Sequence, residues 1–140
     1  QHFLNKAHAG RKRILEIETF EEQMAMLNNI PVTDPIIYDA FAQMPDNKAL
    51  WAALETAWQS GDREALYELA IAEPLRKSPQ SRVVYDALFY QRNIKMATAI
   101  KDCVRTHTQC FVVVGAGHLV GPGSVIELLK NSGANVSFKH

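Results

Sequence analysis

The sequence predicts a helix-rich α/β fold, in which a short parallel sheet carries a helical insertion between its first two strands. Three short segments have the pattern of strands: Arg13–Ile17, Cys110–Val114 and Ala134–Phe138. Capping signals and apolar stripes predict helices over most of the other residues. The closing strand–helix–strand order favours a right-handed parallel crossover. Three strands are few for a covered sheet, so we expect either that helices dominate or that the chain is part of a larger domain.

The first two helices are predicted from the start of the chain and from a capping motif. Gln1–Ala9 has the pattern of the tail of a helix. Thr19 and Glu22 form a capping box, in which each side chain can bond the backbone N–H of the other residue, so a helix should begin at Phe20. Pro31 should end that helix, because proline cannot continue it.

The helical insertion continues with three further predicted helices. They run from an Asp34 cap to about Met44, from an Asp46 cap to a stop at Gly61, and from an Asp62 cap to about Ile71. The aromatic residues Trp51, Trp58 and Tyr67 recur at helical spacing and are expected in the core.

The C-terminal half contains a predicted loop followed by two more helices. Proline and polar residues predict a loop over Pro74–Pro79, and a long helix is expected from about Gln80 to Thr106. Cys110–Val114 is apolar throughout, as in a strand covered on both faces. A glycine-rich turn follows, and a second capping box at Ser124 starts a helix over Val125–Asn131 that Gly133 should terminate.

Composition limits the class of protein. The 140 residues suit one domain over 1–140, and 47% hydrophobic with 21% charged residues is ordinary globular composition. Basic and acidic residues both number 15, so no overall positive field attracts nucleic acid. No apolar run is long enough to span a bilayer. The two cysteines, Cys103 and Cys110, are expected to be buried free thiols.

Two residues lie where sites gather in parallel α/β folds, beyond the carboxyl ends of strands. Glu18 follows the first predicted strand, and His118 lies in the turn after the second. Gly115 and Gly117 should let that turn fold tightly and leave the imidazole free to bind a metal or move a proton. The alternatives are that His118 packs within the turn and that Glu18 only favours the helix dipole. Glu16 lies on the same side of the strand as Glu18.

A third candidate residue is a charge on an apolar stripe. Arg92 falls in the middle of the stripe on the long helix, whereas Lys95 lies off it, as a solvated charge should. A buried guanidinium needs an anionic partner. That partner is either a carboxylate of the protein, Glu18 first and Glu16 second, or a bound anion.

The glycine-rich turn does not match a dinucleotide site. Gly115 and Gly117 are followed by Val120 where the fingerprint needs its third glycine, and no acid follows to hold a ribose. The remaining histidines are expected at the surface: His2, His8, His107 and His140.

With these residues identified, the chain resembles the C-terminal half of the TraB/GumN family, which includes the TIKI metalloproteases. The resemblance is carried by ILEIETFEEQMAMLNNIP, QRNIKMATAI and FVVVGAGHLVGPGSVIELLKNSGANV, in this order and over nearly the whole chain. The family's second G-x-x-H motif falls on Gly115 to His118, its Arg-Asn pair on Arg92 and Asn93, and its Glu-Thr pair on Glu18 and Thr19. Gln91 stands where the family usually has glutamate before the Arg-Asn pair.

The resemblance implies a metal-dependent hydrolase that acts on peptides. It implies that His118 and Glu18 bind a divalent metal (Mn²⁺, Co²⁺ or Zn²⁺), that Glu18 is a ligand or general base, and that Arg92 orients Glu18 or stabilises negative charge. The first G-x-x-H motif has no counterpart in the 140 residues. We therefore expect that the N-terminal half of the same protein is missing and that this chain is an incomplete enzyme.

Other interpretations remain open at this point. The same cleft could belong to a non-catalytic module that binds a peptide or small molecule, or Glu18 and Arg92 could be a structural ion pair. No nucleic-acid partner is expected. The resemblance further implies a bacterial protein exported from the cytoplasm.

Overall fold

The computed structural model describes residues 1–42 and 47–138, and helices dominate it. The α-helices are α1 (His2–Ala9), α2 (Phe20–Asn28), α3 (Asp34–Ala42), α4 (Asn47–Ser60), α5 (Arg63–Tyr67), α6 (Glu73–Lys77), α7 (Arg82–Tyr85), α8 (Gln91–Thr106) and α9 (Val125–Asn131). Two π-helical turns, η2 (Glu68–Ala72) and η4 (Asp86–Tyr90), join consecutive α-helices. Two 3₁₀ turns complete the elements, η3 (Pro79–Ser81) and η5 (Ala116–His118).

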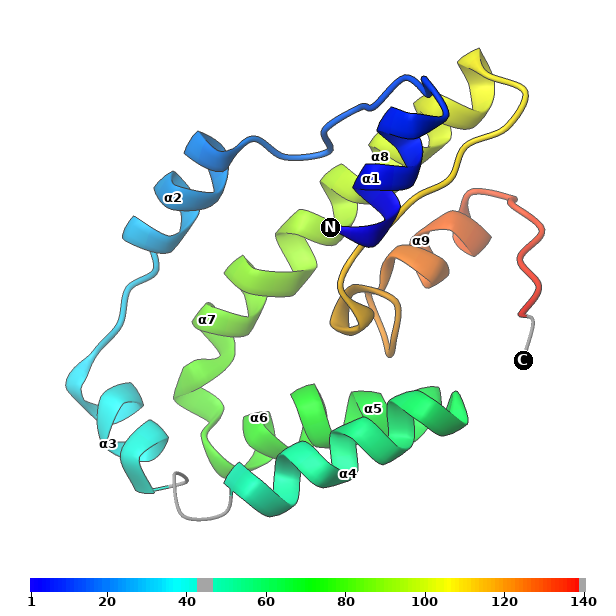
Figure 1. Cartoon of the computed structure of the whole chain (residues 1–140). Helices are drawn as coiled ribbons and strands as arrows, with labels where there is room; N and C mark the ends of the chain where they lie inside the picture. Colours follow the sequence, from blue (N-terminus) through cyan, green and yellow to red (C-terminus); the bar gives the residue numbers. More distant parts are fainter. Residues whose placement is uncertain (43–46, 139–140) are drawn as a thin grey trace.

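A long helical rod made of α7, η4 and α8 runs through the middle of the molecule (Figure 1). The short helix α9 packs against α8, and the turn that precedes α9 lies between them and the α4–α6 layer. The helices α2 and α3 lie on the other side of the rod and are joined by non-helical segments (Figure 1). The rod therefore carries the packed part of the molecule.

The predicted capping residues explain where several helices begin. Thr19 accepts from the N–H of Glu22 (3.2 Å), and the Glu22 carboxylate accepts from the N–H of Thr19 (2.8 Å), which confirms the first capping box. Asp62 caps α5 by accepting from Ala65 N–H (2.9 Å). At the second predicted box Ser124 accepts from Glu127 N–H (3.3 Å), but Glu127 reaches back to Gly123 N–H instead of Ser124.

The predicted long helix is confirmed with one modification. The chain is helical from Pro79 to Thr106, but it begins with a 3₁₀ turn and widens into the π-helical turn η4. A π turn inserts one extra residue into the helical repeat and is often found at functional sites. Here it ends at Tyr90, two residues before Arg92.

The predicted parallel sheet is wrong, because the described residues contain no strand. The segments 13–17, 110–114 and 134–138 are neither helical nor paired with one another. In the second segment Val114 packs on the helical core, while Phe111 and Val113 are 76% and 59% exposed. A strand exists only through ladder hydrogen bonds to a neighbour, and an apolar run can bury one side against helices without any ladder.

Three smaller predictions are wrong or fall outside the described residues. The loop expected at Pro74–Pro79 is largely the helix α6, which continues the helical run of α5 and η2 without a break. Trp51 and Trp58 are 70% and 64% exposed and so are not core residues. The predicted helix end at Met44 and cap at Asp46 lie outside the described residues.

The core is small and lies between α8 and α9. Met96, Ala97 and Val125 form its centre, and six half-buried residues surround them: Ile17, Ile100, Val114, Leu119, Leu128 and Leu129. Cys103 and Cys110 form a disulfide next to this core, which corrects the expectation of free thiols. A seven-residue spacing across a helix end brings their Cα atoms to 6.4 Å, within the range that a disulfide spans.

Candidate functional site

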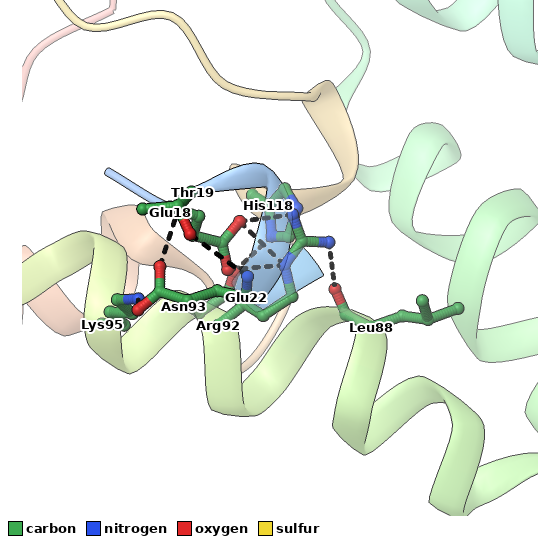
Figure 2. A network of polar contacts seen from close by, with 8 residues as sticks. All are labelled: Glu18, Thr19, Glu22, Leu88, Arg92, Asn93, Lys95 and His118. Carbon is green, nitrogen blue, oxygen red and sulfur yellow. Dashed lines mark hydrogen bonds and ion pairs between the residues drawn. The ribbon is translucent and has the colours of Figure 1, made fainter. Parts of the chain in front are cut away.

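Glu18 and Arg92 form a bidentate ion pair between the segment before α2 and the middle of the rod (Figure 2). Arg92 Nε donates to Glu18 Oε1 and Oε2 (2.9 and 3.1 Å), and Nη2 donates to Oε2 (2.6 Å). Arg92 Nη1 also donates to the carbonyl of Leu88, one helical turn earlier (3.1 Å). The Glu18 and Arg92 side chains are 10% and 21% exposed, so the pairing expected from the apolar stripe is confirmed.

His118 is held by a relay of two hydrogen bonds. Asn93 Nδ2 donates to the carbonyl of Gly123 (2.8 Å), and Asn93 Oδ1 lies 2.7 Å from His118 Nδ1. Because a carbonyl can only accept, the amide nitrogen must face Gly123 and the amide oxygen must face the imidazole. Nδ1 of His118 therefore carries the proton, and Nε2 keeps its lone pair for a metal or a proton.

The turn around His118 is shaped by close packing on the rod. A Cβ on Gly117 would lie 2.6 Å from Cε1 of Phe89, whose ring packs against the His118 ring with centroids 5.4 Å apart. A side chain at position 117 would therefore force the Phe89 ring to move. Gly115 has φ −63° and ψ 143°, and a Cβ there would make only an ordinary contact with Cδ2 of His118 (3.7 Å), so neither its conformation nor its surroundings explain the glycine there.

The surroundings of the site lower the pKa of both its titratable groups, Glu18 and His118, through different causes. The hydrogen bonds from Arg92 lower the pKa of the Glu18 carboxyl, against the opposing effect of burial. Burial lowers the pKa of His118, and the positive charge of Arg92 adds to this, whereas Glu18 opposes it. At neutral pH the site therefore holds a carboxylate, a guanidinium and an uncharged imidazole.

The site brings together the residues that the sequence singled out and adds others. Glu18, Thr19, Arg92, Asn93 and His118 lie side by side around the rod (Figure 2). Their common location was expected from strand ends, yet it comes from helix packing instead.

Sequence reasoning missed the supporting groups. The Leu88 carbonyl, the Phe89 ring and the Gly123 carbonyl each fix one side chain of the site. Backbone carbonyls carry no sequence signal, whereas Phe89, an apolar residue three positions before Arg92, lies on the same side of the long helix and could have been found by that spacing. Lys95, expected to be solvated, pairs with Glu22 (2.5 Å) at the rim, and Glu16 is exposed.

The residues of this site do not make a complete site for a divalent metal. A catalytic zinc-like site uses three protein ligands and an open position. Here His118 offers Nε2, but both oxygens of Glu18 already accept hydrogen bonds from Arg92, whose charge repels a cation. Among the described residues, three potential ligands approach one another at Cys103, His107 and Cys110, which belong to a different part of the chain.

Two apolar cavities lie beside the site. One, of about 350 Å³, is lined by Ala116 and Leu119, the neighbours of the His118 turn, and by residues of α4, α5 and the C-terminal segment. The other, of about 450 Å³, lies between Phe3, the segment 111–114 and α9. Neither is lined by Glu18, Arg92 or His118.

Comparison with known proteins supports the resemblance read from the motifs. No curated protein and no solved structure matches the chain. Within the described residues, none of the helices has the length and apolar character needed to cross a membrane. The family model of the TraB/PrgY/gumN family matches residues 1–137, and the chain therefore belongs to that family.

Proposed function

We propose that this chain carries the Glu18–Arg92–His118 part of a hydrolytic site that acts on peptides. The observation that supports the proposal most directly is the relay from Gly123 through Asn93 to His118, which fixes the proton on Nδ1 and leaves Nε2 free. Burial lowers the pKa of His118 and so keeps the imidazole uncharged. Such an imidazole can accept a proton from an attacking water near neutral pH.

Arg92 supplies the second element of the proposed chemistry. Its bonds to Glu18 and Leu88 use three of the five guanidinium N–H groups. Two N–H groups remain that can stabilise negative charge on a peptide carbonyl oxygen in the transition state. Glu18 would have to give up its bonds to Arg92 to act as a base or a ligand. We therefore assign Glu18 the role of anchoring Arg92.

A divalent metal (Mn²⁺, Co²⁺ or Zn²⁺) enters this proposal only with added ligands. His118 alone would bind it weakly, so a polypeptide that carries the missing G-x-x-H motif has to complete the site. The Cys103–Cys110 disulfide supports a location outside the cytoplasm, because disulfides persist in oxidising compartments.

The test combines metal titration with peptide cleavage. Isothermal titration with Mn²⁺, Co²⁺ and Zn²⁺ on the 140-residue chain should give weak binding that dialysis removes, with cleavage of a peptide mixture near background by mass spectrometry. A polypeptide with a G-x-x-H motif, fused or added separately, should restore both. His118→Ala should then abolish cleavage, whereas His8→Ala, at an exposed histidine, should not.

Two outcomes would contradict the proposal. One is a stoichiometric metal retained by the 140-residue chain, with hydrolysis that depends on His118. The other is a completed protein that cleaves peptides equally well with alanine at position 118.

A second candidate function is binding without catalysis. It is favoured by two observations: both carboxylate oxygens of Glu18 already accept hydrogen bonds from Arg92, and an apolar cavity of about 350 Å³ lies beside the His118 turn. The same experiment separates the two functions, since a binding module would retain peptides in equilibrium dialysis and release them uncleaved.

A further inference from the structure

The C-terminal end of α8 carries a group of metal-ligand side chains that the Glu18–Arg92–His118 site does not use. Cys103 lies in the last turns of α8, His107 follows the helix directly, and Cys110 lies three residues later. Their potential ligand atoms all lie within 4.8 Å of one another. We propose that, once the Cys103–Cys110 disulfide is reduced, these three residues bind one thiophilic metal ion such as Zn²⁺.

The backbone already places the three ligands around one point. Cys103 and His107 are four residues apart, so they lie on the same side of the helix end. The bend at residues 107–108 turns the chain back toward Cys110, with a Cα–Cα distance of 6.4 Å between the cysteines. Two thiolates at about 2.3 Å from a tetrahedral zinc stand roughly 3.8 Å apart. This backbone spacing can accommodate that separation with side-chain rotation alone.

The hydrogen bonds of His107 prepare its ring as a ligand. Nδ1 lies 2.8 Å from Thr106 Oγ1 and 3.3 Å from the carbonyl of Cys103. The Thr106 hydroxyl donates its proton to the carbonyl of Asp102 (2.7 Å). Both partners therefore accept from Nδ1, which must carry the proton, and Nε2 keeps its lone pair. Metal-bound histidines in proteins donate their second ring N–H in this way.

The disulfide and the metal exclude each other, so the site depends on redox state. A dithiol reductant transfers two electrons and two protons, which break the S–S bond, form two thiols and leave the reductant as a cyclic disulfide. Zn²⁺ then displaces the two thiol protons and binds both thiolates and the imidazole. None of the three residues is buried, so water can reach the fourth position. Either state thus links the end of α8 to the segment that leads to the His118 turn.

The test uses the whole chain with His118→Ala, so that binding at the proposed hydrolytic site cannot contribute and the two proposals fail independently. The protein is reduced with a phosphine, freed of reductant without oxygen, and titrated with Co²⁺. We expect one Co²⁺ per chain with thiolate-to-cobalt charge-transfer absorption, displacement of Co²⁺ by Zn²⁺, and no such absorption in the oxidised protein.

Variants identify the ligands. Cys110→Ser should abolish the charge-transfer band at low micromolar protein, and His107→Ala should weaken binding at least about tenfold. Thr106→Val, which removes a partner of the imidazole, should weaken it less, and His8→Ala should leave it unchanged. Equal Co²⁺ binding by the oxidised and reduced proteins would overturn the proposal. So would full affinity in His107→Ala, which would indicate chelation by the two thiols alone.

Discussion

The two sides of the central rod are stabilised in different ways. On one side α8, the His118 turn and α9 enclose the buried residues Asn93, Met96, His118 and Val125. On the other side α2 contains no buried residue, and its Phe20 is 70% exposed. The packed side is fixed by apolar contacts and by internal hydrogen bonds, whereas the segment with Glu18 and α2 is attached mainly by charges.

This difference shows how the site depends on Arg92. Glu18 comes from the weakly packed side, and its ion pair with Arg92 joins it to the packed side. The Lys95–Glu22 pair adds a contact, but its side chains are 44% and 51% exposed, so it contributes little. Loss of Arg92 should therefore leave the Glu18 carboxylate largely buried without a partner, while the His118 relay stays in place.

The largest effect is expected for Arg92→Ala. The variant leaves the Glu18 carboxylate without its partner, which should lower the free energy of unfolding by about 3 kcal/mol or more. Denaturant unfolding measures the change. The matched control is Arg76→Ala, whose pair with Glu68 is 61% and 45% exposed and should cost less than about 1 kcal/mol. If Arg92→Ala stays within about 0.5 kcal/mol of the parent, the ion pair does not join the two sides.

Two glycines with positive φ test the contrast between packed and open backbone. Gly121 (φ +73°) lies in the His118 turn, and a Cβ there would come within 2.0 Å of Tyr67 Cδ2. Gly133 (φ +89°) follows α9 and has nothing within 4 Å of the same position. Gly121→Ala combines strain and overpacking and should cost roughly 3 kcal/mol. Gly133→Ala carries only the strain, about 1 kcal/mol.

Thermal or denaturant unfolding of both glycine variants gives the comparison directly. Equal losses would mean that the turn has room to relax, and that the packed side is less rigid than the contacts of Tyr67 indicate.

Local signals predicted the helix ends and the ion pair, because these depend on residues close in sequence or on a single stripe. Thr19, Asp62 and Ser124 cap their helices as their side chains predict. Arg92 was predicted to be buried and paired because a guanidinium within an apolar stripe needs an anionic partner. The roles in catalysis assigned to Glu18, Arg92 and His118 stay predictions.

The sequence did not reveal that the three predicted strands stay unpaired, because strand formation depends on partners distant in sequence. Val112 and Val114 are residue types that favour strands. The side chain of Val114 is nevertheless covered by helical neighbours, which take the place that a second strand would have. Trp51 was assigned to the core by its spacing alone, but spacing shows only which residues share a face of the helix. Whether that face is covered depends on the rest of the fold.

The smallest effect expected is the pH dependence that His118 gives to the packed side. Burial and Arg92 lower the pKa of His118 in the folded protein below its unfolded value. Between these two values the unfolded chain binds more protons than the folded one, so stability is complete above about pH 6.5 and decreases as the pH falls below it. Glu18, whose pKa is also lowered, adds a separate loss at more acidic pH, where its ion pair with Arg92 is broken by protonation.

Denaturant unfolding at pH 7.5 and 5.5 checks this prediction, with His118→Gln as the variant that cannot titrate. The parent should lose stability between the two pH values, by less than the loss expected for Arg92→Ala, because only one proton is involved. His118→Gln should show a smaller loss, and His8→Ala, on the exposed helix α1, should behave like the parent. A parent that becomes more stable at pH 5.5 would show that the Glu18 carboxylate outweighs burial and Arg92 and favours a charged imidazole. The packed side would then depend on a charged interaction at His118, as the segment with Glu18 and α2 depends on the ion pair with Arg92.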